Sequence, residues 1–243
     1  MEANHLQEQR TKMYTDLFNN IIPERFPVQD GLGWSYLIEY AGEDLMLTQC
    51  SCSTEKAIEI LEKGREILRA DNFTAAGGQN PISLMFQQST QSVMSSNGML
   101  QHPEQEYMSP DEYDEFIRNP YDFMLECVSP RSNPAYAKGE VFRSLHYARY
   151  LLSSMEAHEK LNAANSYIKD KYGLYSAPPG SGAHQYVPFD FLADHVRGFS
   201  KIPIDIRRQP DKVLAAMEAL EPVCMWAGHN KVQSVLGSNL LPT

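Results

Sequence analysis

The chain has 243 residues, of which 42% are hydrophobic and 21% are charged, a composition typical of a folded globular protein. Acidic residues outnumber basic residues by 31 to 21, which gives a formal net charge of −10. Proteins bind nucleic acid through clustered Lys and Arg side chains. With this excess of acidic residues, nucleic acid is not an expected partner.

The sequence also indicates a cytoplasmic protein. Residues 1–10 are polar and do not resemble a signal peptide. The apolar runs are shorter than the roughly 18 residues that a membrane span needs, so no membrane association is expected. Four cysteines in a chain of this length do not form a dense disulfide framework, and a reducing cytosol is the expected compartment.

The first third of the chain predicts a helix, a strand, a second helix and a second strand. Apolar spacing predicts a helix over residues 4–20, which Pro23 stops. A short strand is expected at residues 25–28, and residues 34–40 are interpreted as an aromatic loop or another short strand. A helix capped by Ser53 is expected over residues 54–69, and a strand over residues 73–76.

The remaining residues continue this pattern after an interruption. Residues 91–130 are expected to form an insertion, irregular at first and then helical, with a capping box at Ser109 to Glu112. Beyond it, the sequence predicts helices over residues 135–170, 188–198 and 210–227, a third strand at residues 174–177 and the start of a fourth within residues 232–243.

This order of elements predicts a parallel α/β architecture. Strands that alternate with helices form βα units, and three to four such units are counted here. A closed (β/α)8 barrel needs about twice as many strands. The expected fold is therefore an incomplete (β/α)8 TIM-type barrel, about its first half, as one domain over residues 1–243 with the helical insertion at 91–130.

Three stretches resemble the uroporphyrinogen decarboxylase superfamily, in its decarboxylase-like and corrinoid methyltransferase-like branch. The first joins residues 25–28 (RFPV) to residues 36–40 (YLIEY). The second joins residues 107–117 (YMSPDEYDEFI) to residues 119–123 (NPYDF). The third runs from residues 188–191 (PFDF) through 197–199 (RGF) to 204–213 (IDIRRQPDKV). The resemblance implies a (β/α)8 barrel that is longer than this chain, so the chain is expected to be C-terminally truncated.

The resemblance implies three alternative functions. The first is a corrinoid-dependent methyltransferase-like enzyme, which moves a methyl group from a small methylated substrate to a corrinoid on a partner protein. No cofactor is expected within this chain, because the zinc ligands of such enzymes would follow the third stretch. The second is a divergent uroporphyrinogen decarboxylase of porphyrin biosynthesis. The third is an inactive fragment or half-barrel that a second chain completes.

The sequence favours the first alternative over the second. Decarboxylases of this kind hold substrate carboxylates with arginines in the loop after the first strand. Here residues 29–35 read QDGLGWS and contain no arginine. Substrate carboxylates in such a pocket would be left without cations, which is energetically costly.

The loops that follow the predicted strands contain the candidate ligand-binding residues, because barrel sites lie at the carboxyl ends of the strands. A carboxylate, amides, an imidazole and a phenol in these loops are expected to orient a small polar ligand. The candidates are Asp30, Trp34, Gln79, Asn80, His184, Tyr186 and Asp190. The alternative interpretation is that they are ordinary polar loop residues whose side chains cap backbone groups.

No metal site is expected within the chain. Cys50 and Cys52 are separated by one residue, which is closer than the usual pairs of zinc-binding cysteines. They are interpreted as ordinary buried or loop thiols. The seven histidines show no metal-ligand spacing, and no catalytic residues are assigned.

Overall fold

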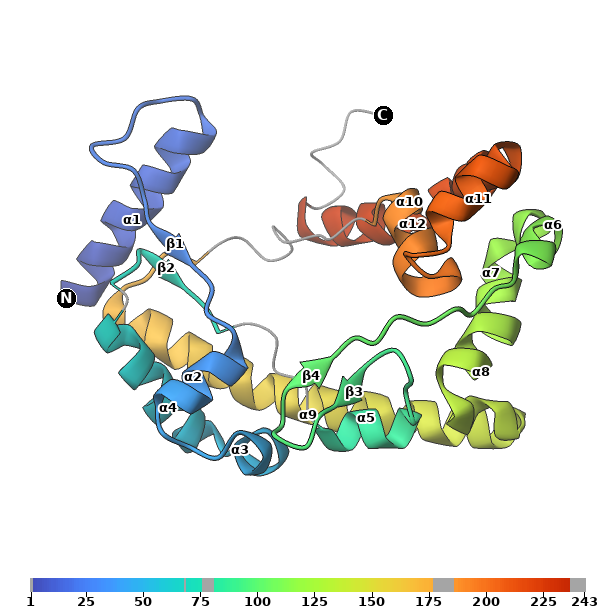
Figure 1. Ribbon diagram of the computed structural model, residues 1–243. Helices are drawn as coiled ribbons and strands as arrows, with labels where there is room; N and C mark the ends of the chain where they lie inside the picture. Colours follow the sequence, from blue (N-terminus) through green and yellow to red (C-terminus); the bar gives the residue numbers. More distant parts are fainter. Residues whose placement is uncertain (1, 68, 76–80, 177–185, 237–243) are drawn as a thin grey trace. The chain divides into compact units, whose positions relative to one another are not determined.

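The computed structural model describes residues 2–67, 69–75, 81–176 and 186–236 (Figure 1). These residues are mainly helical and include a few two-residue strands. The first elements in chain order are α1 (Glu2–Phe18), β1 (Gln29–Asp30), α2 (Trp34–Tyr40), α3 (Leu45–Ser51), α4 (Thr54–Ile67), β2 (Asn72–Phe73) and α5 (Pro81–Gln87). They are followed by β3 (Val93–Met94), β4 (Leu100–Gln101), η1 (Pro110–Glu112), α6 (Tyr113–Arg118), α7 (Pro120–Phe123), η2 (Met124–Val128), α8 (Ser129–Ser132) and η3 (Pro134–Lys138). The last are α9 (Glu140–Tyr172), α10 (Pro188–Leu192), η4 (Ala193–Arg197), α11 (Ile202–Arg208) and α12 (Pro210–Leu236).

The chain divides into two compact units, each with its own hydrophobic core. Unit 1 comprises Met1–Phe86, Met94–Leu100 and Tyr147–Ser176. Unit 2 comprises Gln87–Val93, Gln101–His146 and Ala177–Thr243. The division falls within α9 and within the predicted insertion at residues 91–130, so both of these contribute residues to each unit.

Most of the predicted helices are confirmed with shifted boundaries. α1, α4 and α9 correspond to the helices expected at residues 4–20, 54–69 and 135–170. The predicted cap of α4 is present, because the backbone N–H of Lys56 donates to Ser53 Oγ at 3.2 Å. These helices were accessible to prediction because caps and apolar periodicity are local features.

The prediction of a loop or strand at residues 34–40 is wrong, because these residues form α2. Trp34, Leu37 and Ile38 are buried, and Ala41 follows them at 9% exposure. Their spacing of three, four and seven residues places them on one helical face. The aromatic residues Tyr36 and Tyr40, which suggested a strand, lie exposed on the other side of α2.

Unit 1 contains a parallel strand pair. Gln29 pairs with Asn72 and Asp30 pairs with Phe73, in parallel orientation. α2, α3 and α4 connect the two strands, which is the crossover that parallel strands require (Figure 1). The parallel orientation agrees with the expected parallel architecture. The strand expected at residues 25–28 is wrong, because β1 begins at Gln29, one residue beyond that segment.

The expected third strand is not present in residues 174–176, and residue 177 lies outside the described residues. This segment nevertheless contacts the region of β2, because the Tyr175 N–H donates to the carbonyl of Asp71 at 2.8 Å. Beyond Phe73, the backbone is bonded by a side chain: Ala75 N–H donates to Asn165 Oδ1 at 3.1 Å. Asn165 lies in α9, so a helix side chain and not a neighbouring strand bonds the Ala75 backbone.

Asp71 anchors three separate parts of unit 1. Its carboxylate accepts two hydrogen bonds of 2.6 Å from Arg25, one of 3.1 Å from Arg10 and one of 2.9 Å from the Val28 N–H. Arg10 also donates to the carbonyls of Tyr172 and Gly173 at the end of α9. The Arg25 guanidinium is the main cause that lowers the pKa of Asp71 to about 2.

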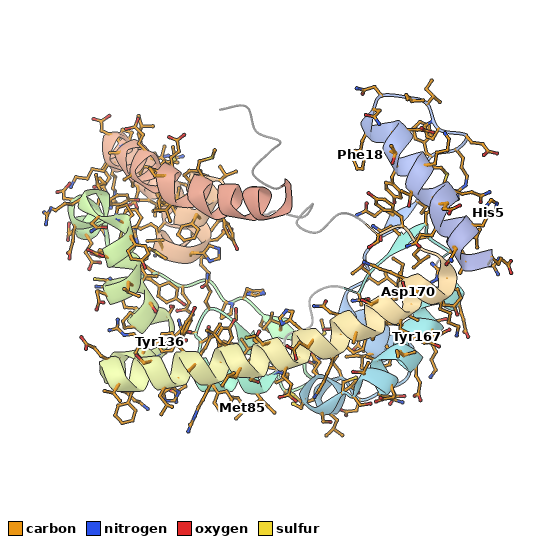
Figure 2. The ribbon with its side chains drawn as sticks, turned by 180° about the vertical axis from the view of Figure 1, so that it is seen from behind. His5, Phe18, Met85, Tyr136, Tyr167 and Asp170 are labelled. Carbon is orange, nitrogen blue, oxygen red and sulfur yellow. The ribbon has the colours of Figure 1, made fainter. Side chains whose placement is uncertain are left out.

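Figure 2 labels several residues of unit 1. Phe18 lies at the end of α1 and is 72% exposed, whereas Tyr167 and Asp170 lie near the C-terminal end of α9 (Figure 2). Met85 lies on α5, which is joined to α9 by a hydrogen bond of 2.9 Å between Ser83 and Ser153 (Figure 2). α5 and α9 therefore pack side by side.

Unit 2 is a helical assembly that begins with the predicted capping box. The Ser109 N–H donates to Glu112 Oε2 at 2.7 Å, and the reciprocal bond to the Ser109 side chain is also present. Arg131 from α8 binds the same Glu112 carboxylate at 2.7 Å. The apolar residues of α6, α7, α10 and α12 form the core, which includes Phe116, Phe123 and Leu192.

A buried ionic network connects the elements of unit 2. The Arg197 guanidinium, 4% exposed, donates to Asp205 at 2.5 Å and to the carbonyl of Met108 at 3.0 Å. Arg197 also forms an ion pair with Glu106. The Tyr113 hydroxyl donates to Asp205 at 3.0 Å, and burial is the main cause that raises the pKa of Tyr113. These charges are paired, as buried charges must be, and the network fixes α11 and η4.

The expectation of a fourth strand beginning at residue 232 is wrong for residues 232–236. These residues continue α12, which is 27 residues long and contains Pro222. Residues 237–243 of the predicted strand lie outside the described residues. The apolar residues of this segment therefore did not by themselves distinguish strand from helix.

Candidate functional site

The candidate residues from the sequence fall in both units. Asp30 lies in β1 and Trp34 opens α2, so both belong to unit 1. Tyr186 and Asp190 belong to unit 2: Tyr186 lies just before α10, and Asp190 lies within it. Gln79, Asn80 and His184 lie outside the described residues. The convergence of these residues on one rim therefore stays a prediction, and each unit is considered by itself.

Unit 1 contains a cavity of about 730 Å³ that includes Trp34 in its wall. This volume lies within the range of roughly 300–1,000 Å³ that small-molecule sites occupy. The lining comes from α2, α3, α5 and α9, and Phe86 and Leu152 add apolar surface. Trp34 is only 5% exposed because it belongs to the core of unit 1, together with Leu37 and Ile38 of α2.

Two buried polar residues of α3 also line this cavity. Thr48 and Gln49 are each 9% exposed. The Gln49 Nε2 donates to the carbonyl of Leu45 at 3.2 Å and to the carbonyl of Gly98 at 2.8 Å. Both N–H bonds of the amide are therefore used, and this fixes which end of the amide is oxygen. Neither Gln49 Oε1 nor the Thr48 hydroxyl belongs to the buried side-chain atoms that lack a hydrogen-bond partner within the described ranges.

Charged side chains of α9 contribute to the same cavity. Lys160 forms an ion pair of 2.8 Å with Glu156, one helical turn away. Arg149 also lines the cavity, and no acidic side chain within the described ranges pairs with it. The three charges leave a surplus of one positive charge at the cavity, although the chain as a whole has a net charge of −10.

The two thiols of residues 50 and 52 line the cavity as well. Cys52 caps the C-terminal end of α3, and its thiol donates to the carbonyl of Ser53 at 3.3 Å. Burial is the main cause that raises the pKa of both thiols, although the positive charges of Lys160 and Lys56 act in the opposite direction on Cys52. The thiols are thus protonated at neutral pH, which makes them poor nucleophiles.

Unit 2 places Tyr186 beside a half-buried histidine. The ring of Tyr186 meets the rings of His195 and Phe191 edge-on, at centroid distances of 5.3 and 5.5 Å. Gln91 Nε2 lies 2.6 Å from His195 Nδ1 and also donates to the carbonyl of Asp194 at 3.0 Å. The amide donor makes Nδ1 the acceptor, so Nε2 carries the proton of the neutral ring.

His195 borders two smaller hollows of unit 2. One has a volume of about 410 Å³ and is also lined by His102, Glu104 and Phe199. Burial is the main cause that lowers the pKa of His195, which leaves the ring neutral and able to donate from Nε2 at neutral pH. Asp190 is exposed and is not part of the lining of either hollow. The structure thus brings Tyr186 to His195 but does not bring Asp190 to it.

The described ranges contain no group of three or more histidine, cysteine or acidic side chains arranged to hold a metal ion. Within the same ranges, none of the helices combines the length and the apolar character that crossing a bilayer requires.

The sequence indicated Trp34 and Tyr186 but missed the residues that surround them. Thr48, Gln49 and Arg149 lie on helices that are about 100 residues apart in the chain, so no local spacing relates them. His195 was not among the candidate residues from the sequence. The one available signal was the pair of polar residues on the otherwise apolar face of α3, which is weak because α3 is only 7 residues long.

No protein-family model, curated protein or solved structure matches this chain.

Proposed function

We propose that the chain is the first part of a (β/α)8 barrel of the uroporphyrinogen decarboxylase superfamily and serves a corrinoid-dependent methyltransferase-like enzyme. In this proposal, unit 1 binds the small methylated substrate. The single observation that supports it most is the parallel pairing of β1 and β2 through the helical crossover of α2 to α4. Such a crossover is the repeating step of a barrel.

The position of the cavity supports substrate binding by unit 1. Trp34 lies four residues beyond the end of β1, on the segment that follows the carboxyl end of the strand. In barrels of parallel strands, the segments that follow the strands form the ligand site. The cavity of about 730 Å³ has the size of a small-molecule site and has aromatic, aliphatic and charged side chains in its wall.

The chemistry assigned to this chain is limited to binding and orienting the substrate. Methyl transfer breaks the bond between the methyl carbon and its heteroatom, and the electron pair of that bond stays on the heteroatom. A zinc ion would supply Lewis-acid activation of the heteroatom when bound. The residues described here do not suit zinc, because Cys50 and Cys52 are separated by only one residue and no group of three ligand side chains surrounds them. The corrinoid is proposed to be carried by a partner protein.

Two further observations bear on the proposal. The four cysteines are free thiols, which supports a location in the reducing cytoplasm. Arg10 and Arg25 both bind Asp71, so neither offers its guanidinium to a substrate carboxylate. This disfavours the alternative in which the protein decarboxylates a porphyrinogen.

The test uses the gene beyond this reading frame. The chain is expressed together with the residues encoded downstream, and methylation of free cob(I)alamin by methanol, methylamine and methanethiol is followed by visible absorbance. We expect the downstream region to encode a His-x-Cys sequence with a later cysteine, and the extended protein to methylate cob(I)alamin. A downstream region with a single late histidine, and conversion of uroporphyrinogen to coproporphyrinogen, would instead identify a decarboxylase.

A second chain that completes the barrel is the other candidate. Phe26 and Val28, which lead into β1, expose 72% and 54% of their surface, and exposed apolar side chains favour association. Light scattering coupled to size-exclusion chromatography tests this candidate. A dimer would support it, and a monodisperse monomer over the micromolar range would contradict it.

A further inference from the structure

We propose that two copies of this chain pair through an apolar stripe along one exposed face of α9. The inference goes beyond the proposed function, because it assigns an interaction surface and not a ligand. The stripe consists of Val141, Leu145, Ala148, Leu152 and Met155.

The residues of the stripe have the spacing of helices that pair with one another. They recur at alternating intervals of four and three residues, and α9 is a continuous helix over all of them (Figure 1). This heptad spacing keeps side chains on one narrow face of a helix, which is the face that meets the partner in a coiled coil. The same helical geometry places the buried residues Leu161, Ala164 and Ile168 of α9 on the opposite face.

The stripe is exposed, and it ends within α9. Val141, Leu152 and Met155 expose 81%, 68% and 57% of their surface. Beyond Met155, the same spacing leads to Glu159, Asn162, Ser166 and Lys169. One face of the same helix is therefore apolar over its first two heptads and polar over the next two, which makes the stripe a localised surface patch.

The stripe is large enough for a specific contact. Phe142 and Leu151 flank it and expose 53% and 39% of their surface. With these two residues it presents roughly 600 Å² of apolar surface, at the upper end of the largest patches on monomeric proteins. Two copies that cover this surface mutually would bury roughly 1,200 Å² in total, and a specific interface needs about 1,000 Å².

A second copy is the occupant that the side chains of the stripe fit, because a two-fold dimer needs a patch that complements itself. In an antiparallel pair, Leu145 of one copy faces Met155 of the other. The small Ala148 likewise faces the large Leu152, so these layers are filled and contain no charge. A shift by one heptad shortens the apolar overlap, in one direction because Ala148 then faces Glu159.

Sedimentation equilibrium of the full chain tests the inference. We expect a monomer–dimer equilibrium with a dissociation constant in the micromolar range. Leu152→Glu is expected to weaken the dimer more than about tenfold, because pairing then buries a charge without a partner. A chain that stays monomeric up to about 100 µM would overturn the inference.

Ser166→Glu is the matched control. It adds the same charge to the same face of α9, at an exposed position beyond the stripe. We expect it to leave the dissociation constant unchanged, and equal weakening by Leu152→Glu and Ser166→Glu would contradict a contact through the stripe. Circular dichroism verifies that both variants keep their helices. If Leu152→Glu does not, Met155→Glu takes its place at a position that is also exposed.

A further variant separates this dimer from the completion of the barrel by a second chain. Phe26→Lys charges the exposed segment that leads into β1 and leaves α9 unchanged. We expect the dimer to persist in Phe26→Lys and to dissociate in Leu152→Glu. The reverse result would reject the α9 contact and support pairing near β1. Methyl transfer by the extended protein is measured separately, so the proposed function and this inference succeed or fail independently.

Discussion

At the scale of single residues, Asp71 is the charged residue whose hydrogen bonds join several segments of unit 1. Its carboxylate is 3% exposed and binds two arginines and a backbone N–H from three different segments. The local signal in the sequence is limited to an Asp-Asn pair at residues 71 and 72, directly after the helix predicted at residues 54–69. Its partners are 46 and 61 residues away in the chain, so their identity depended on tertiary structure.

Replacement of Asp71 with asparagine is expected to destabilise unit 1 by about 2 kcal/mol. The amide keeps the shape but leaves Arg10 and Arg25 without their counter-charge, and the half-exposed position of Arg25 limits the loss. Urea denaturation followed by circular dichroism measures the change. Glu59→Gln, which removes an exposed partner of Lys56, is the control and is expected to change stability by less than about 0.5 kcal/mol.

The same carboxylate predicts a dependence of stability on acid. The pKa of Asp71 is lowered from 3.8 to about 2 in the folded chain. Because the folded pKa is the lower one, the stabilisation is present above the unfolded pKa and is lost as the pH falls through the folded pKa. We expect the free energy of unfolding of unit 1 to decrease between pH 4 and pH 2. An Asp71→Asn variant with an equally steep decrease would show that other groups are responsible.

At the scale of elements, the close approach of α2 and α4 is decided by a glycine. A Cβ atom at Gly64 would lie 2.5 Å from Leu37 Cδ2 and 3.6 Å from the ring of Phe73. Gly64 belongs to the helix predicted at residues 54–69, where glycine is otherwise unfavourable. The spacing of Gly64 from Ala57 and Leu61 places it on an apolar helix face, but the sequence did not reveal which residue packs against it.

Gly64→Ala is expected to destabilise unit 1 by about 1 kcal/mol. The gain in helix propensity is smaller than the cost of displacing Leu37 within a filled core. Gly33→Ala is the matched control, because no atom lies within 4 Å of the added Cβ and its φ of −59° suits alanine. Thermal unfolding of both variants measures the difference. A Gly64 variant as stable as the Gly33 variant would contradict the close packing of α2 on α4.

At the scale of the whole molecule, the two cores share no residue. The core of unit 1 centres on residues such as Leu37 and Leu61, and the core of unit 2 on residues such as Tyr113 and Phe116. Separate cores are the usual basis of separate folding units. The sequence analysis treated residues 1–243 as one domain, since alternating helices and strands do not reveal which apolar faces meet.

We therefore expect calorimetry to resolve two unfolding transitions. Ser109→Ala removes half of the capping box and is expected to destabilise unit 2 by about 1 kcal/mol, which lowers the midpoint of one transition. Asp71→Asn is expected to lower the midpoint of the other. Equal shifts of a single transition by both variants would show that the chain unfolds as one cooperative unit.

The sequence by itself determined the long helices α1, α4 and α9, the caps at Ser53 and Ser109 and the general position of β2, because these depend on residues within a few positions of one another. It also pointed to Trp34, whose place after the first strand is a local property. Only the tertiary structure placed Gln49 and Arg149 in one cavity, joined Asp71 to Arg10 and Arg25, and divided the apolar residues between two cores. Those pairings depend on contacts between segments distant in the chain, and such contacts leave no periodicity that a single sequence displays.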